Sequence, residues 1–284
     1  MSKRIVVGTD GSVSAAAAVE WAVDDATRKK VPLHIVSVVE RWPYSIARYP
    51  APPDAGDTLV HAAERILADA AARALRHRPE ATVTTEMIEG YPAAVLRDQE
   101  KDAAQIVVGS RGLGGFAGAM LGSVSGHVAG QAHCPVVVVR PDAEATHGEI
   151  VVGVDDSAEC EPALAYAFEQ ALLRGATLRA LHAWLSPRHG YVPGIPYDMD
   201  DVRRAQHQLL AQRLATLGGK YPRVTVIEDV QCAHPVDALT QASKRADLVV
   251  VGSHGRGTVG ALLLGSVSRA LLHHSSCPVA VVRS

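Results

Sequence analysis

One long sequence pattern occurs twice in this chain, and the repeat limits the folds that the chain can adopt. Residues 107–125 read VVGSRGLGGFAGAMLGSVS, and residues 248–268 read LVVVGSHGRGTVGALLLGSVS. In each copy an apolar run typical of a strand enters a glycine-rich loop, which closes with Gly-Ser before a short helical stretch. The glycines have the same spacing in both copies: Gly109, Gly112 and Gly122, then Gly252, Gly255 and Gly265.

Each half of the chain alternates between apolar strand-like runs and helical stretches. The first runs, RIVVGTD at 4–10 and EIVVGVD at 149–155, are continuously apolar, as in strands buried on both faces of a parallel sheet. Each half then follows the order β-α-β-α-β-α-β-α-β, which requires right-handed crossovers and helices on both faces of the sheet. The polar segment 141–149 separates the halves. We therefore predict an α/β protein with two tandem domains, 1–143 and 147–284, each containing a five-stranded parallel sheet.

Composition excludes several classes of protein. Of the 284 residues 48% are hydrophobic and 20% are charged, which is enough apolar material for two sizeable cores. The net charge is -2, with acids and bases interspersed, so we expect no nucleic-acid partner. No apolar run is long enough for a membrane span, and the first residues lack the features of a signal peptide. We therefore expect a cytoplasmic protein.

Cysteines and histidines show none of the spacings typical of metal sites. The four cysteines form no C-x-x-C pair, and the 13 histidines are scattered. Cys134 and Cys277 each precede a proline and a Val-rich run, so we interpret them as small hydrophobic residues. We expect no disulfide and no metal site made by the protein alone.

The repeated loop has the chemistry of a phosphate site. Ligands of open parallel sheets bind at the carboxyl ends of the strands, where Asp10 and Asp155 end the first strand of each half. Glycines let the backbone approach a phosphate closely, and the amides of a helix N-terminus favour an anion. The residues at the helix start are Gly122, Ser123 and Ser125 in one half, and Gly265, Ser266 and Ser268 in the other. Asp10 and Asp155 could accept a hydrogen bond from a ribose hydroxyl or help to hold a cation.

Other nucleotide and catalytic motifs match less well. Gly255 to Gly260 fits G-x-G-x-x-G, and Gly112 to Ala117 fits its Ala-ended form. That fingerprint requires an acidic residue about 20 positions later, beyond another strand. Gly219-Lys220 lacks the upstream glycine of a P-loop, and no G-x-S-x-G elbow is present. Because no catalytic base recurs in both loops, the pattern indicates a binding site first, with slow ATP hydrolysis as an alternative.

These motifs resemble those of the universal stress protein family in its tandem-domain form. The family's ATP-binding members carry G-x2-G-x9-G-[S/T], which Gly109 to Ser123 and Gly252 to Ser266 match. The openings Val7 to Ser12 and Val152 to Ser157, and the final Cys-Pro-Val strands, are also similar. The resemblance covers nearly the whole chain. It implies two Rossmann-like domains, also called flavodoxin-like or adenine nucleotide alpha hydrolase-like, each holding ATP, with Mg2+ near Asp10 and Asp155.

The resemblance also implies which residues bind the nucleotide. Those of the first half are Gly8, Asp10, Val38, Val108, Gly109, Arg111, Gly112, Gly122, Ser123, Val124 and Ser125. Those of the second half are Gly153, Asp155, Ala183, Val251, Gly252, His254, Gly255, Gly265, Ser266, Val267 and Ser268. The first half departs from the pattern by placing Gly114, Gly115 and Gly118 in its spacer, so we expect weaker binding there.

The family's final strand commonly pairs across a two-fold interface. Here VVVVR and VAVVR could pair within one chain, and a homodimer is a further expectation. We expect a nucleotide-responsive regulator of stress or growth adaptation. The alternatives are a slow ATP hydrolase and an interaction scaffold that binds no nucleotide or prefers a cyclic one.

Overall fold

Two units make up the chain, Met1–Asp142 and Ala143–Ser284. The computed structural model describes residues 3–40, 55–113, 121–141, 146–157, 160–185, 199–255 and 264–283. Each unit is an alternation of strands and helices in the predicted order.

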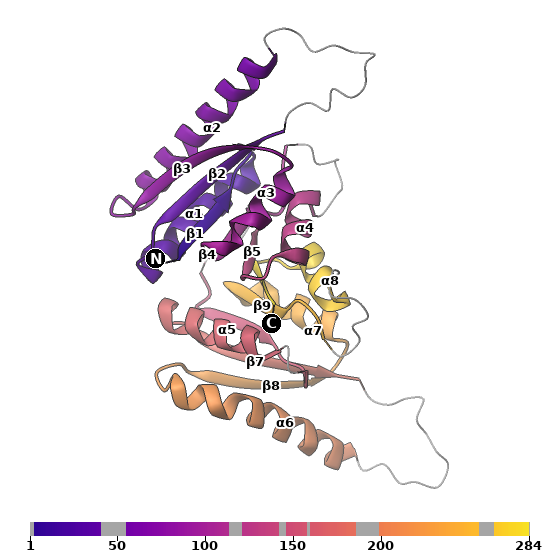
Figure 1. Ribbon diagram of the computed structural model, residues 1–284. Coiled ribbons are helices and arrows are strands. Elements are labelled where there is room, and N and C mark those ends of the chain that lie inside the picture. Colours follow the sequence, from indigo (N-terminus) through magenta and orange to yellow (C-terminus); the bar gives the residue numbers. More distant parts are fainter. Residues whose placement is uncertain are drawn as a thin grey trace, which may run out of the picture. The chain divides into compact units, whose positions relative to one another are not determined.

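The first unit contains five parallel strands in the order β3-β2-β1-β4-β5. Its elements are β1 (Arg4–Gly8), α1 (Val13–Lys29), β2 (Leu33–Val39), α2 (Ala55–His77), β3 (Val83–Glu89), α3 (Pro92–Asp98), η1 (Gln99–Lys101), β4 (Ala103–Gly109), α4 (Ser123–Gln131) and β5 (Val136–Val139). Helix α1 packs on α2, and α3 packs on α4 (Figure 1). With right-handed crossovers, these two pairs cover opposite faces of the sheet.

The second unit repeats this arrangement, with the strand order β10-β9-β6-β7-β8. Its elements are β6 (Glu149–Gly153), α5 (Cys160–Arg174), β7 (Thr177–Trp184), α6 (Met199–Lys220), β8 (Val226–Cys232), α7 (Pro235–Ala242), η2 (Ser243–Arg245), β9 (Leu248–Gly252), α8 (Ser266–His274) and β10 (Val279–Val282). The predicted fold, two tandem α/β domains with parallel sheets, is confirmed.

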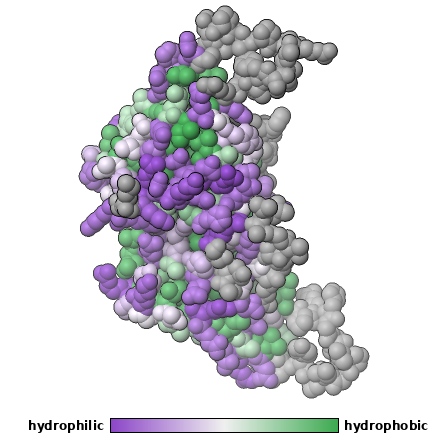
Figure 2. Space-filling view, viewed as in Figure 1, coloured by the Kyte–Doolittle hydropathy of each residue, from purple (hydrophilic) through white to green (hydrophobic). Residues whose placement is uncertain are grey.

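Apolar strands and one stripe of the first helix form the core of each unit. Ile5, Val6 and Val7 of β1 are fully buried, as a strand covered on both faces should be. On α1 the predicted stripe of Ala18, Val19, Ala22 and Val23 is fully buried against the sheet. The equivalent stripe on α5 is Ala163, Leu164 and Ala167, while Leu172 lies at its edge and is half-buried. Outside the cores, hydrophilic and apolar side chains are intermixed on the visible surface (Figure 2).

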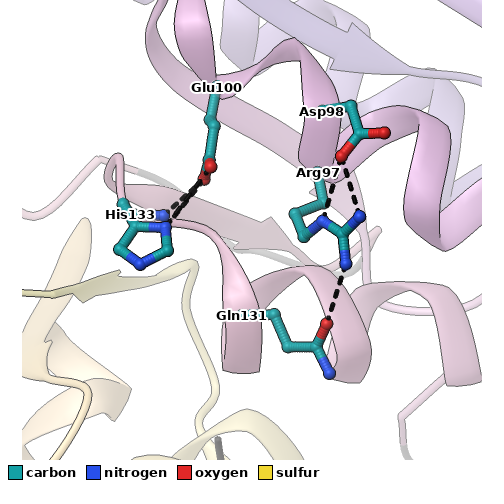
Figure 3. Close-up of polar contacts among 5 residues, drawn as sticks. All are labelled: Arg97, Asp98, Glu100, Gln131 and His133. Carbon is teal, nitrogen blue, oxygen red and sulfur yellow. Dashed lines mark hydrogen bonds and ion pairs between the residues drawn. The ribbon is translucent and has the colours of Figure 1, made fainter. Parts of the chain in front are cut away.

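The turn from α4 into β5 is held by side chains at the edge of the sheet where α3 and α4 end (Figure 3). The Glu100 carboxylate accepts a hydrogen bond from the backbone N–H of His133 at 2.6 Å. In the second unit Ser243 does the same for Ser276, with its hydroxyl 3.0 Å from the backbone nitrogen. Beside Glu100, Arg97 donates to Asp98 and to Gln131. Because the contact recurs with different side chains, we interpret this cluster as structural.

The four cysteines are free thiols that differ in burial. Cys160 and Cys277 are buried, Cys134 is partly exposed, and Cys232 is exposed. Burial raises the pKa of Cys277 to about 11 and that of Cys134 to about 12, so both remain protonated at neutral pH.

Among the described helices, none combines the length and the hydropathy that a membrane-spanning helix needs.

Candidate functional site

The loops after β1 and β4 lie next to each other at the carboxyl edge of the first sheet. In the order β3-β2-β1-β4-β5 the direction of the strand sequence reverses between β1 and β4, and in the second unit it reverses between β6 and β9. Ligands of open α/β sheets bind at such a point. Asp10 follows β1 and the glycine loop follows β4, so the fold brings the predicted carboxylate and the predicted loop together.

Asp10 and Ser12 tie the two loops of the first unit to each other. One carboxylate oxygen of Asp10 accepts from the backbone N–H of Ser12 at 3.0 Å, and the other accepts from that of Leu113 at 2.8 Å. The Ser12 hydroxyl donates to the carbonyl of Arg111 at 3.2 Å and also caps α1 by accepting from the Ala15 N–H. The start of the glycine loop is therefore fixed to the turn after β1.

The described hydrogen-bond partner of Asp155 in the second unit is close in sequence. Its Oδ1 accepts from both the backbone N–H and the hydroxyl of Ser157, at 3.0 and 2.5 Å. The Ser157 hydroxyl thus donates to Asp155, whereas the Ser12 hydroxyl donates to the glycine loop. Among the residues that the structure describes, Asp155 makes no bond to the loop after β9, and Arg256, the counterpart of Leu113, lies outside them.

The second glycine of each motif lies against the aspartate. A Cβ placed on Gly112 would be 2.4 Å from Oδ2 of Asp10, and one on Gly255 would be 2.7 Å from Oδ2 of Asp155. A side chain at either position would have to displace the carboxylate. The repeated G-x2-G spacing therefore has a physical cause in this close approach.

The Gly-Ser pairs form the N-termini of α4 and α8. Gly122 and Gly265 are the N-cap residues, and no side chain caps either helix. Each N-cap amide donates to a carbonyl of the loop, Gly122 to Ser110 and Gly265 to Ser253, both at 2.8 Å. Beyond the cap, the first-turn amides have no partner within their helix. Ser123 and Ser266 are exposed at this position, as an anion site requires.

The two later serines of the motif hold the loop. Ser125 and Ser268 are buried, at 2% and 3% exposure. The Ser125 hydroxyl donates to the carbonyls of Ser110 and Gly122, at 3.1 and 3.0 Å. The Ser268 hydroxyl donates to the carbonyl of Gly252 at 2.6 Å. Their proposed contact with a phosphate stays a prediction, and the geometry adds a structural role that the sequence analysis did not identify.

Other predicted glycines are packed against helices. A Cβ on Gly109 would be 2.6 Å from the backbone carbon of Ser14, so the close packing of α1 on β4 requires glycine there. A Cβ on Gly8 would be 2.7 Å from Cδ1 of Leu96, and one on Gly153 would be 3.1 Å from Cδ1 of Leu239. These positions are explained by packing whether or not a ligand is bound.

The apolar residues predicted to line the site differ in exposure. Val108 and Val251 are 4% exposed, so their side chains belong to the core. Val38 and Ala183 are half-buried near the ends of β2 and β7. Val124 and Val267 are half-buried in the first turns of α4 and α8.

Several further residues of these loops were not predicted from the sequence as candidates for the site. Val13 and Leu113 are 76% and 72% exposed. Val13 directly follows the turn after β1, and Leu113 lies in the glycine loop after β4. Nothing in the sequence distinguishes them from ordinary loop residues. Ser110 and Ser253 are also missed residues, but both follow the first glycine of the motif, so a comparison of the two copies could have found them.

Arg111 and His254 occupy equivalent positions with different surroundings. Arg111 is exposed, and His254 is half-buried. Nδ1 of His254 lies 2.9 Å from the hydroxyl of Ser253. Nε2 of His254 is buried and has no hydrogen-bond partner among the described residues.

Part of each glycine loop lies outside the described residues. This holds for Gly114, Gly115 and Gly118, so weaker binding in the first unit stays a prediction. It also holds for Gly260 and Ala117 of the alternative fingerprints. Within the described ranges, no group of three or more His, Cys, Asp or Glu residues could hold a metal ion.

Comparisons with known proteins agree with this architecture. The model of the universal stress protein family matches residues 1–140 and again 147–283. Universal stress protein Rv2005c of Mycobacterium tuberculosis is 37% identical over 286 residues, covering 98% of this chain and 96% of that protein. Universal stress protein Rv2623 of the same organism is also 37% identical, covering 99% and 97%. The crystal structure of a universal stress protein from Archaeoglobus fulgidus matches 100% of this chain and 99% of its own, with a TM-score of 0.73 and 22% identity.

Proposed function

The chain belongs to the universal stress protein family as a tandem member, and from this premise we propose that each half binds one ATP at the carboxyl edge of its sheet. The single observation that carries the proposal is the glycine N-cap of α4 and of α8. Ser12 of α1 and His234 of α7 each accept a hydrogen bond from a first-turn amide, whereas no side chain does so in α4 or α8. Such amides and the helix dipole favour a phosphate.

The phosphates would contact the amides of Ser123 and Val124 in the first half, and of Ser266 and Val267 in the second. The exposed hydroxyls of Ser123 and Ser266 would add one further donor each. Glycine at the N-cap supports this arrangement because a Cβ at Gly122 or Gly265 would stand beside the same amides. Side chains there would reduce the space for a phosphate oxygen.

The nucleoside would lie over the ends of the first two strands of each half. Asp10 and Asp155 supply carboxylate oxygens for a ribose hydroxyl, and Val38 and Ala183 supply apolar contact with the base. The exposed side chains of Val13 and Leu113 are further candidates for contact with the base in the first half. Mg2+ fits as a partner of the nucleotide, because a single carboxylate together with phosphate oxygens is a usual Mg2+ environment.

A binding protein without dedicated catalytic groups acts through the difference between its bound and free states. We therefore propose that the chain is a nucleotide-responsive regulator, and that it acts in the cytoplasm. Pairing of the two apolar final strands within one chain, and formation of a homodimer, remain predictions from the sequence. Sedimentation at several protein concentrations measures the oligomeric state.

The test of ATP binding begins with protein purified without added nucleotide. The protein is denatured, and released nucleotide is identified by absorbance and mass. ATP is then added to nucleotide-free protein, and the unfolding temperature is measured. A matched control is the chain with Gly122→Val and Gly265→Val, which should release no nucleotide and show no ATP-dependent shift. Wild-type protein that is empty and is not stabilised by ATP would refute the proposal.

A further inference from the structure

Helix α6 is bonded to the turn that carries Asp155. This turn, residues 154–157, follows β6, and we call it the Asp155 turn. Arg213 of α6 is half-buried, and its guanidinium donates to the backbone carbonyl of Asp156. The bond therefore joins the helix to the residue directly after Asp155. An interaction that fixes this carbonyl also limits the directions that the Asp155 carboxylate can take.

A second connection between α6 and the Asp155 turn passes through a buried histidine of β7. His182 is 2% exposed, and its Nδ1 lies 2.8 Å from the carbonyl oxygen of Val154. A carbonyl oxygen can only accept, so Nδ1 carries the hydrogen of this bond. Nε2 of the same ring lies 2.8 Å from the side-chain amide of Gln206, on α6. The carbonyls on both sides of Asp155 are thus bonded, one directly to α6 and the other through His182.

The position of α6 itself is fixed by the core of the second unit. Leu210, Leu214 and Leu217 are its buried residues, and the helix packs on β7 and β8. Arg213 directly precedes Leu214 and so extends from the part of the helix that is anchored to the sheet. A side chain on such a rigid element holds its partner more precisely than one on a loop.

The first unit has different residues at the corresponding places. Ser37 stands at the place of His182, as the register of β2 with β1 and of β7 with β6 shows. Gly11 stands at the place of Asp156, and a Cβ on Gly11 would be 3.1 Å from Cγ1 of Ile66 on α2. This contact between the second helix of the unit and the turn after its first strand is apolar, whereas the contacts in the second unit are hydrogen bonds.

We propose that Arg213 and His182 are positioning residues of the second site, which hold the Asp155 carboxylate in the orientation that the ligand needs. The inference rests on the proposed ATP binding, in which this carboxylate accepts from a ribose hydroxyl, and it adds α6 to the second site. A carboxylate whose neighbouring carbonyls are fixed loses less freedom on binding, so affinity rises without a new contact. The coupling is reciprocal, so a ligand on Asp155 also strengthens the attachment of the turn to α6.

The first test compares variants of the Gly122→Val chain, which keeps the second site. Arg213→Gln removes the charged donor. Arg203→Gln is the matched control, because Arg203 lies on the same helix and donates to Asp200 in the preceding turn. ATP affinity is measured by calorimetry. We expect Arg213→Gln to weaken binding roughly three- to fivefold and the control to leave it unchanged.

A double-variant cycle with Asp155→Ala separates positioning from a direct contact of Arg213 with phosphate. If Arg213 acts through the carboxylate, Arg213→Gln should have no further effect in a chain that already carries Asp155→Ala, where ATP still contacts α8. A contact with phosphate would weaken binding by the same factor whether residue 155 is aspartate or alanine. That result overturns the inference and leaves ATP binding intact.

Hydrogen exchange in the ligand-free chain tests the geometry without ATP. The Ser157 amide donates to Oδ1 of Asp155, so it should exchange faster when Arg213→Gln releases the turn. His182→Leu should have the same effect, and His182→Asn, which keeps a donor near the place of Nδ1, should have less. A Ser157 exchange rate unchanged by Arg213→Gln overturns the inference and leaves ATP binding intact. Absence of ATP binding in the wild-type chain overturns the proposed function and this inference with it.

Discussion

The two candidate sites share one end of the glycine loop, and at the other end they differ in sequence and in their described bonds. Where the loop enters its helix, both units have a glycine N-cap bonded to a carbonyl at 2.8 Å and a buried serine bonded back to the loop. Where the loop leaves its strand, Asp10 bonds to Leu113 across the loops, while the described bonds of Asp155 go to Ser157. The proposed phosphate binding requires the shared end, and the variable end can give the two sites different ligand affinities.

The comparison predicts that the shared end responds equally in both units. Gly122→Val should abolish binding in the first half and Gly265→Val in the second, with at least about a hundredfold loss of affinity each, because several charge-assisted hydrogen bonds are blocked. A Cβ at these positions would lie 3.4 and 3.3 Å from the carbonyl oxygens of Ser110 and Ser253, so the Cβ itself requires at most a small shift of the loop. Calorimetry with ATP measures the loss, and circular dichroism checks the fold. An intact affinity in either variant would separate the helix N-terminus from the site.

Substitutions of the aspartates should distinguish the two variable ends. Asp10→Asn places an amide or a neutral oxygen opposite the N–H groups of Ser12 and Leu113, which loosens the loop. We expect roughly a tenfold loss of ATP affinity in the first half, since hydrogen bonds to charged groups contribute about 1.5–3 kcal/mol. Asp155→Asn should cost less, because the Ser157 hydroxyl can rotate to suit the new side chain. Equal losses in the two single-site chains would show that the difference in loop bonding has no effect on binding.

Glycines of the same motif should differ in their effect on stability. Gly109→Ala places a Cβ 2.6 Å from the backbone of Ser14, so it should destabilise the first unit by about 1–3 kcal/mol through overpacking. Gly122→Ala, with its nearest atom at 3.4 Å, is the matched control and should be nearly neutral. Urea unfolding measures both. A stable Gly109→Ala chain would mean that α1 can shift away from β4.

The smallest predicted effect is a pH dependence confined to the first unit. Burial of His34 lowers its pKa, and the hydrogen bond to Glu86 offsets part of that shift. The unfolded chain then binds the proton more tightly, so the first unit should lose stability as the pH falls below about 6.5. Arg179 occupies the equivalent place in the second unit, bonded to Glu149 and Asp229, and does not titrate there.

Hydrogen exchange followed separately in β2 and β7 can test this difference between the units. Exchange in β2 should accelerate between about pH 7 and pH 5 beyond the intrinsic pH effect, and that in β7 should not. His34→Gln should remove the excess, and an unchanged excess in that variant would assign the effect to another group.

The sequence was sufficient for the fold because the information is local and repeated. Local patterns of three kinds each predict one kind of element. They are continuous apolar runs such as 4–8, the apolar stripe on α1, and a Gly-Ser pair before a helix. The N-caps Gly122 and Gly265 and their helices followed from the same signals. Asp10 and the glycine loop were expected to be adjacent because a β-α-β alternation predicts a parallel sheet. Ligands of such sheets bind at the carboxyl ends of the strands, where both features lie.

Features that depend on contacts between distant segments could not be predicted. The hydrogen bond from the Ser12 hydroxyl to the Arg111 carbonyl joins residues far apart in the chain, and no local sequence pattern predicts it. Burial of the Ser125 hydroxyl and packing of Gly109 on α1 depend on side-chain positions within the folded unit. The same is true of the unpartnered nitrogen of His254, which in the sequence is one of 13 histidines.

Native mass spectrometry of the chain with ATP tests most directly that each half holds one nucleotide. We expect up to two ATP molecules per wild-type chain, one in the Gly122→Val chain, one in the Gly265→Val chain, and none in the double variant. A wild-type chain that never carries more than the double variant, at ATP concentrations in the cellular range, would contradict it.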